Sequence, residues 1–122
     1  MNSSLNDINK VLSLYTKNVN VVMQSVFDTT ARDAANRLKK ESPKAKGKYA
    51  KNWAVKKERG KATVYNKAPT YRLTHLLENG HDVVVNGKKV GHANPQVHIK
   101  PVDDWVQDEL PKRLEEALGN VD

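Results

Sequence analysis

The feature that most constrains the fold of this chain is a long series of residues at helical spacing near its start. The members are separated by steps of three and four: Leu5, Ile8, Leu12, Tyr15, Val19, Val22 and Val26, then Phe27, Thr30, Ala34 and Leu38. This stripe predicts one amphipathic helix from about residue 4 to about residue 40, stopped by Ser42-Pro43. At about 1.5 Å per residue the helix exceeds about 50 Å, which is longer than a domain of 122 residues is wide.

That length leaves two possibilities open. Either the helix breaks near residues 18–22, where Asn and β-branched residues concentrate, or its first half projects toward another subunit. The stripe has more apolar positions than a small sheet needs, because residues 27–38 already supply a face for it. We therefore predict a subunit interface formed by Leu5, Ile8, Leu12, Tyr15 and Val19.

The middle of the chain predicts two strands and a short helix. Residues 52–56 and 61–66 have strand composition and are joined by a turn at residues 58–60. Thr70 is a candidate cap for a helix over residues 71–79, with Leu73, Leu76 and Leu77 facing inward and Gly80 as its stop.

The last third predicts a hairpin, a strand and a helix. Residues 83–85 and 88–90 flank Asn86-Gly87, which readily supplies the two positive φ angles of a tight primed turn. Residues 97–99 read as a short strand ended by Pro101. A final amphipathic helix follows, and Pro111 inside it predicts a kink or a restart.

The fold class expected from this order is α+β. It comprises a long N-terminal helix, a small, mostly antiparallel sheet with a β-hairpin, a short middle helix and a C-terminal helix. The chain is expected to form a single domain over residues 1–122, with a helical arm at 1–40 and an α+β body at 41–122.

The positive charge is concentrated in one segment. Residues 39–67 contain eleven Lys or Arg against Glu41 and Glu58, a net charge of +9, whereas the remaining ten basic and twelve acidic residues give −2. Lys44, Lys46, Lys48 and Lys51 lie in an exposed loop of this segment, where they would meet an acidic partner or DNA phosphates. A small basic nucleic-acid-binding protein is therefore an alternative function. Few aromatic residues are present to stack bases.

Several other classes of function find little support. Cysteine is absent, and the spacing of His75, His81, His92 and His98 matches no metal signature, so we expect no metal and no cofactor; a metal-dependent nuclease would rest on these histidines alone. Neither a phosphate-binding loop nor a nucleophile elbow occurs, so we expect no enzyme. No apolar run is long enough for a membrane span and residues 1–10 are polar, which predicts a soluble intracellular domain without membrane contact.

Several motifs resemble one known family. These are Val64-Tyr65-Asn66-Lys67, the run from Tyr71-Arg72-Leu73-Thr74-His75 to Gly80-His81, residues 87–90, and His98-Ile99-Lys100-Pro101. Together with the stretch from Gly47 to Trp53, they resemble the gene-ten-type neck and tail-component family of long-tailed double-stranded DNA phages. The resemblance covers about residues 46–118, and the N-terminal helix is generic.

This resemblance implies a structural virion protein that acts in head-tail joining or tail completion. It implies assembly with itself into a ring-like homo-oligomer and docking onto connector and tail proteins, with possible non-specific contact to packaged DNA through the basic loop. The protein would reside in the neck or tail of the virion, and in the host cytoplasm during assembly. The family has no catalytic residues to carry over, and Pro111 departs from what is expected in its last helix.

Overall fold

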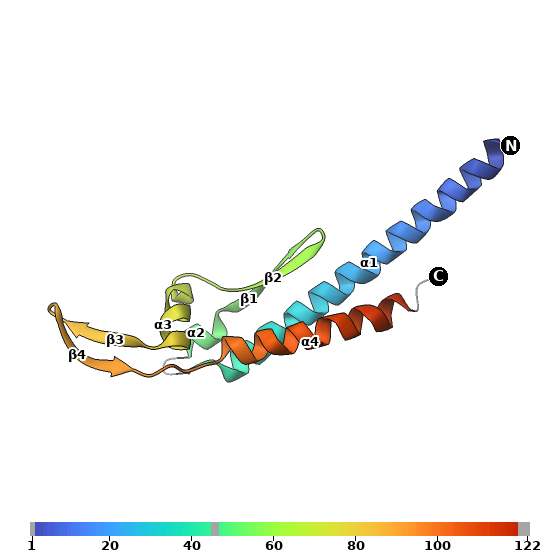
Figure 1. Ribbon diagram of the computed structural model, residues 1–122. Helices are drawn as coiled ribbons and strands as arrows, with labels where there is room; N and C mark the ends of the chain where they lie inside the picture. Colours follow the sequence, from blue (N-terminus) through green and yellow to red (C-terminus); the bar gives the residue numbers. More distant parts are fainter. Residues whose placement is uncertain (1, 45–46, 120–122) are drawn as a thin grey trace.

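The computed structural model describes residues 2–44 and 47–119, with only the backbone of residues 2–6. The elements in chain order are α1 (Asn2–Glu41), α2 (Lys48–Lys51), β1 (Trp53–Glu58), β2 (Lys61–Asn66), the 3-10 turn η1 (Thr70–Leu73), α3 (Thr74–Asn79), β3 (His81–Val85), β4 (Lys88–Ala93) and α4 (Ile99–Leu118). The fold is α+β, as predicted. Figure 1 shows an elongated molecule with the start of α1 at one end and the β3–β4 hairpin at the other.

Helix α1 is unbroken over its 40 residues and is therefore about 60 Å long. The break considered near residues 18–22 does not occur, so the first half projects instead (Figure 1). The helix ends where the sequence predicted. The N–H of Ser42 donates to the carbonyl of Leu38 at 2.9 Å, and Pro43 follows.

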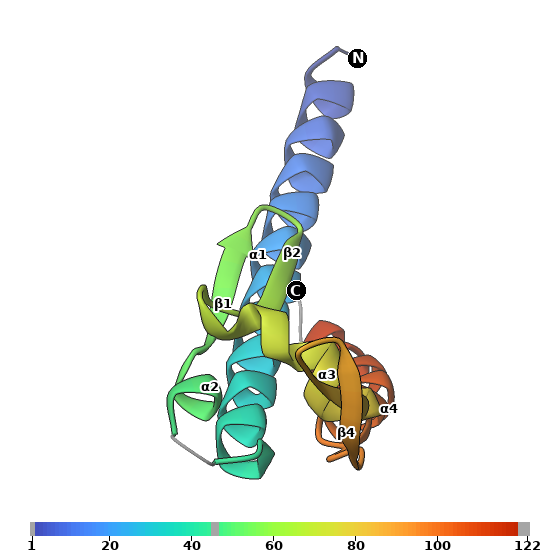
Figure 2. The same cartoon turned by 90° about the vertical axis from the view of Figure 1, so that its left-hand side faces the viewer.

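The core lies around the second half of α1. Ala34 and Leu38 of α1 form a buried cluster with Tyr49, Trp53 and Val102. Half-buried apolar side chains surround this cluster: Val64, Leu77, Ile99, Trp105 and Val106. Figure 2 shows that the β1–β2 hairpin and α4 pack on different sides of α1. The body is therefore built around one helix rather than on one sheet.

The strands form two separate sheets of two strands each, not the single small sheet that was expected. In the first, β1 pairs antiparallel with β2 from Trp53↔Asn66 to Glu58↔Lys61. In the second, β3 pairs with β4 around the predicted primed turn, where Asn86 and Gly87 have φ angles of 51° and 79°. The chain between the two hairpins runs through η1 and α3.

The predicted inward positions of the short helix are wrong for two of three leucines. Leu73 and Leu76 are 40% and 41% exposed, and only Leu77 packs against the core. The segment is a 3-10 turn followed by a single short α-helix, which changes the direction in which side chains leave it. Gly80 ends α3 as predicted, but with a φ of 73° and a ψ of 170° it does not adopt the left-handed helical conformation expected of such a stop.

Thr70 does not cap this helix through its side chain. It is buried, and its hydroxyl donates to Oδ1 of Asn66 at 2.6 Å and accepts a hydrogen bond from Nδ2 of Asn52 at 2.9 Å. The side chain thus closes the open end of the β1–β2 hairpin.

The strand predicted at residues 97–99 is also wrong, because α4 already begins at Ile99. Pro101 lies in the first turn of α4 instead of ending a strand, and proline is tolerated there because first-turn N–H groups have no partner within the helix. Pro111 neither breaks nor restarts α4. Both Pro111 and Gln107 are exposed, so water can reach the carbonyl that loses its helical partner.

Candidate functional site

The first half of α1 is an apolar surface without a partner within the described chain. Every side chain from residue 7 to residue 18 is exposed. Among the predicted interface residues, Ile8 is 54% exposed, Leu12 57% and Tyr15 48%, whereas Val19 is half-buried. The side chain of Leu5 lies outside the described residues. An exposed stripe of large apolar residues is the surface feature most often associated with protein contacts.

The structured body holds α1 at the boundary of this projecting half. Gln24 of α1 accepts a hydrogen bond from the N–H of Gly60 at 2.7 Å and donates to the carbonyl of Lys61 at 3.3 Å. It also donates to Asp28 at 3.0 Å. One amide side chain therefore fixes the tip of the β1–β2 hairpin against α1, and the residues before it extend beyond the body.

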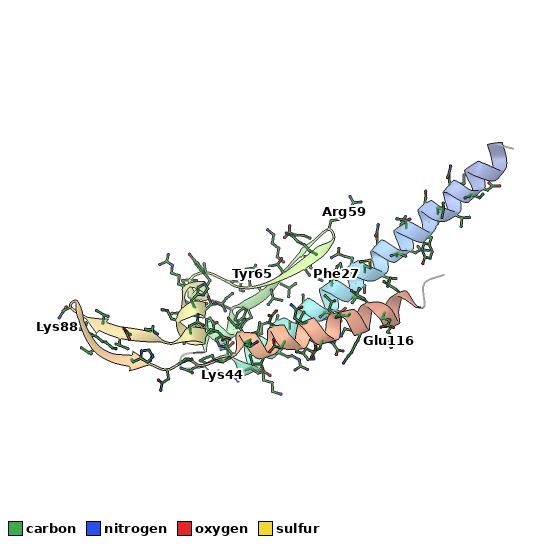
Figure 3. All side chains as sticks on the ribbon, viewed as in Figure 1. Phe27, Lys44, Arg59, Tyr65, Lys88 and Glu116 are labelled. Atoms are coloured by element: carbon green, nitrogen blue, oxygen red, sulfur yellow. The ribbon has the colours of Figure 1, made fainter. Side chains whose placement is uncertain are left out.

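The predicted basic loop is only partly within the described chain. Lys44 is exposed between α1 and α2, and Lys48 and Lys51 are exposed on α2, whereas Lys46 lies outside the described residues. Figure 3 shows Lys44 far from the projecting end of α1. No ion pair is found for Lys44, Lys48 or Lys51 among the described side chains. The loop and the apolar stripe are thus separate surfaces.

The motif residues around Glu78 and His98 form a helix cap. Oε1 of Glu78 accepts hydrogen bonds from the N–H groups of His98 at 2.8 Å and Ile99 at 3.0 Å, and Oε2 accepts from the N–H of Lys100 at 2.9 Å. Pro101 has no N–H to satisfy. The carboxylate therefore takes the free donors at the start of α4 and ties that helix to α3.

The ring of His98 is the most deeply buried large side chain in the described structure. Its Nε2 lies 2.7 Å from the hydroxyl of Tyr49, and its Nδ1 lies 2.7 Å from the carbonyl of Gln96 and 3.1 Å from Oε1 of Glu78. A ring that donates from Nδ1 and accepts from Tyr49 at Nε2 satisfies both nitrogens. Tyr49 and Trp53 pack edge-on against it. His98 thus has a structural position in the core.

The charges of this cluster follow from its surroundings. Burial opposes ionisation of Glu78, but the three backbone N–H donors outweigh it, and the pKa of Glu78 lies below its ordinary value. Burial, together with the nearby negative charge of Glu78, raises the pKa of Tyr49 to about 12. Glu78 is therefore an ionised cap at neutral pH, and Tyr49 stays protonated.

The remaining histidines do not gather into a site. His75 is exposed, and Nδ1 of His92 lies 2.9 Å from Oδ1 of Asp82 on the surface of the β3–β4 hairpin. Nδ1 of His81 is buried without a hydrogen-bond partner. Across residues 2–44 and 47–119, no three His, Asp or Glu side chains come together as metal ligands. None of the helices in that part of the chain is long and apolar enough to cross a membrane.

Sequence reasoning missed a second exposed apolar element. All residues from 82 to 90 of the β3–β4 hairpin are exposed, and its apolar members include Val84 at 59% and Val90 at 63% exposure. The signal was present in the three consecutive valines at 83–85, because successive strand residues point to opposite faces. A two-stranded hairpin by itself is at best marginally stable in water, so burial of its apolar faces against a partner would stabilise it.

A slender body with exposed apolar elements at both ends is typical of a protein that acts by assembling with others. The chain belongs to the HK97-gp10-like family: the family model described as "Bacteriophage HK97-gp10, putative tail-component" matches residues 6–80. The match includes the N-terminal helix and ends at the glycine that closes α3. No curated protein and no solved structure shows significant similarity to the chain.

Family membership agrees with the resemblance seen in the sequence and makes this a phage tail component of structural type, with a place in the virion. Such a component acts through contacts with other tail proteins. The motif residues Glu78 and His98 build the fold, so the surfaces left for those contacts are the ones that the fold does not use.

Proposed function

We propose that this protein functions in head-tail joining or tail completion by assembling with itself into a ring and docking onto connector and tail proteins. The observation that supports this proposal most strongly is the exposed stripe on the first half of α1. Ile8, Leu12 and Tyr15 occupy one side of a helix that extends well beyond the body. Most of the stability of a helix in a protein comes from packing of its apolar face, so a neighbour that covers this stripe would stabilise the projecting half.

The proposal assigns no catalytic role and no cofactor to the chain. The buried polar groups that sequence motifs bring together are already used in capping and packing, as at Glu78 and His98. A ring subunit needs surfaces that recognise neighbours, and the exposed face of α1 supplies one.

The test is the assembly state of stripe variants. We expect the double variant Ile8→Asn/Leu12→Asn to lose assembly in concentration-dependent light scattering, while its Tm in dilute solution stays within about 2 °C of wild type because both positions are exposed and contribute little to stability. Lys10→Asn, on the polar side of the same helix, serves as the matched control. A collapsed Tm in a protein that stays monomeric would show that the stripe is internal core and would contradict the proposal.

Within such a ring, we propose that Lys44, Lys46, Lys48 and Lys51 contact packaged DNA. The exposure of Lys44, Lys48 and Lys51 without ion-pair partners supports this assignment. We expect Lys44→Glu/Lys48→Glu/Lys51→Glu to leave the Tm unchanged and to reduce DNA retention in assembled particles. Tight, sequence-selective duplex binding by the free protein would instead favour a small basic nucleic-acid-binding protein.

A further inference from the structure

The outward side of α4 carries an acidic stripe. Asp104, Asp108 and Glu115 are all exposed and are spaced so that they share one side of the helix, with exposed Lys112 at its edge. Asp104 pairs with Lys100 at 3.3 Å, on its own helix. The last turn of α4 has no basic residue, so Glu115 lies near the negative end of the helix dipole. A positive partner would relieve this arrangement.

The β1–β2 hairpin carries the opposite charge. Lys56, Arg59 and Lys67 are exposed on it, and no ion pair is found for any of the three among the described side chains. Lys61 pairs with Glu58 at 3.7 Å near the turn. Figure 3 shows Arg59 at the tip of this hairpin, away from the body. The uncompensated positive charge therefore extends from the tip to the base of the hairpin.

The two surfaces cannot meet within one molecule. Both elements pack on α1, but on different sides of it (Figures 1 and 2). An apolar groove lined by Phe27, Ala31, Val64, Val106 and Leu110 separates them. The acidic stripe is about 16 Å long from Asp104 to Glu115, and the basic hairpin spans roughly 20–25 Å. The surfaces are thus opposite in charge and comparable in length.

We propose that the acidic face of α4 in one copy docks against the basic face of the β1–β2 hairpin in a second copy. The contact is heterologous because two different surfaces meet, and repetition of such a contact generates a ring when the rotation closes. This inference rests on the proposed self-assembly and identifies the charged surfaces that orient it. The apolar stripe of α1 supplies burial, and charge complementarity sets register and excludes wrong pairings.

A second copy of the chain accounts for both charged surfaces, whereas a nucleic acid accounts for only one. DNA phosphates would account for the hairpin lysines and Arg59, but they would repel Asp104, Asp108 and Glu115. A copy of the same chain accounts for both surfaces at once, and it is present at every site of assembly.

The test is a charge swap on the full chain. We expect Lys56→Glu/Arg59→Glu and Asp104→Lys/Asp108→Lys each to raise the concentration for half-assembly by about tenfold, because like charges then face each other. The quadruple variant restores opposite charges and should return to within about threefold of wild type. Lys88→Glu/Lys89→Glu on the β3–β4 hairpin is the control for a change in net charge. Circular dichroism melts establish that each variant is folded.

The outcomes separate the inference from the proposed function. A quadruple variant no better than the weaker pair, or an Asp104→Lys/Asp108→Lys protein that assembles like wild type, overturns the charged contact while self-assembly stands. If Lys56→Glu/Arg59→Glu loses binding to a 30-base-pair duplex and assembles normally, the basic hairpin is a nucleic-acid surface and the inference is wrong. Wild-type protein that stays monomeric at every concentration overturns both.

Discussion

The two halves of α1 follow one hydrophobic pattern but have opposite environments. In the second half the buried positions are mostly small, with Ala31, Ala34 and Ala35 between 3% and 7% exposed, so α4 and the β1–β2 hairpin can approach the helix closely. In the first half the same spacing carries large side chains such as Leu12 and Tyr15, and these are 57% and 48% exposed. The spacing of the apolar residues predicts a helix in both halves. The size of these residues distinguishes the packed half, where the buried positions are mostly small, from the exposed half, where they are large.

The sharpest test of this difference is to replace one leucine by alanine in each half of the stripe. We expect Leu38→Ala to cost about 2–5 kcal/mol of unfolding free energy, because Leu38 is 4% exposed in the central cluster and its removal leaves a cavity. Leu12→Ala should change the stability of the dilute monomer by less than about 0.5 kcal/mol. Urea unfolding at low protein concentration measures both, and equal losses would show that the first half is packed.

The cap on α4 should have the next largest effect. We expect Glu78→Gln to destabilise the body by about 1.5–3 kcal/mol at pH 7, because charged hydrogen bonds to His98, Ile99 and Lys100 are weakened. The projecting half of α1 should be unaffected. Chemical unfolding followed by the fluorescence of Trp53 and Trp105 reports on the body specifically.

The ionised state of Glu78 also predicts that the stability of the protein depends on pH, and the Glu78→Gln variant tests this. Because the pKa of Glu78 in the folded protein lies below its ordinary value of 4.5, its contribution is complete above pH 4.5 and is lost as the pH falls through the folded pKa. The wild-type protein should therefore lose its greater unfolding free energy, relative to Glu78→Gln, as the solution becomes acidic. An advantage that persists down to pH 2 would contradict the ionised cap.

The smallest effect is expected at the boundary between the two halves. Gln24→Ala removes two hydrogen bonds to the turn of the β1–β2 hairpin and should cost about 1 kcal/mol. Amide exchange should become faster at Gly60 and in the middle of α1, while protection around Leu38 stays unchanged. Slower exchange, or loss of protection throughout α1, would show that Gln24 does not mark the end of the packed half.

Much of the architecture follows from local sequence alone. The stripe and Ser42-Pro43 fixed the extent of α1 within a few residues, and Asn86-Gly87 fixed the turn of the β3–β4 hairpin, because these signals act over one or two turns of chain. Predictions that needed long-range packing were wrong. Leu73 and Leu76 looked inward on a regular helix but are exposed on the 3-10 turn and short helix that form instead.

The strand expected at residues 97–99 shows the same limit for the candidate sites. Val97-His98-Ile99 has strand composition, but the carboxylate of Glu78, twenty residues earlier than His98, takes up the N–H groups of His98, Ile99 and Lys100 and starts a helix there. The motif that indicated the family could be recognised in the sequence, whereas its role as a cap needed the positions of both segments.

The sequence by itself determined the long amphipathic helix, the α+β class, the concentration of positive charge in one segment and the family resemblance, since each depends on residue type and spacing. Only the tertiary structure decided that residues 7–18 have no partner within the described chain, that Glu78 and His98 are structural, and that the acidic side of α4 and the basic hairpin lie on different sides of α1. The physical reason is that burial and charge pairing depend on which distant segments meet. Periodicity describes one face of one element, and it does not say what covers that face.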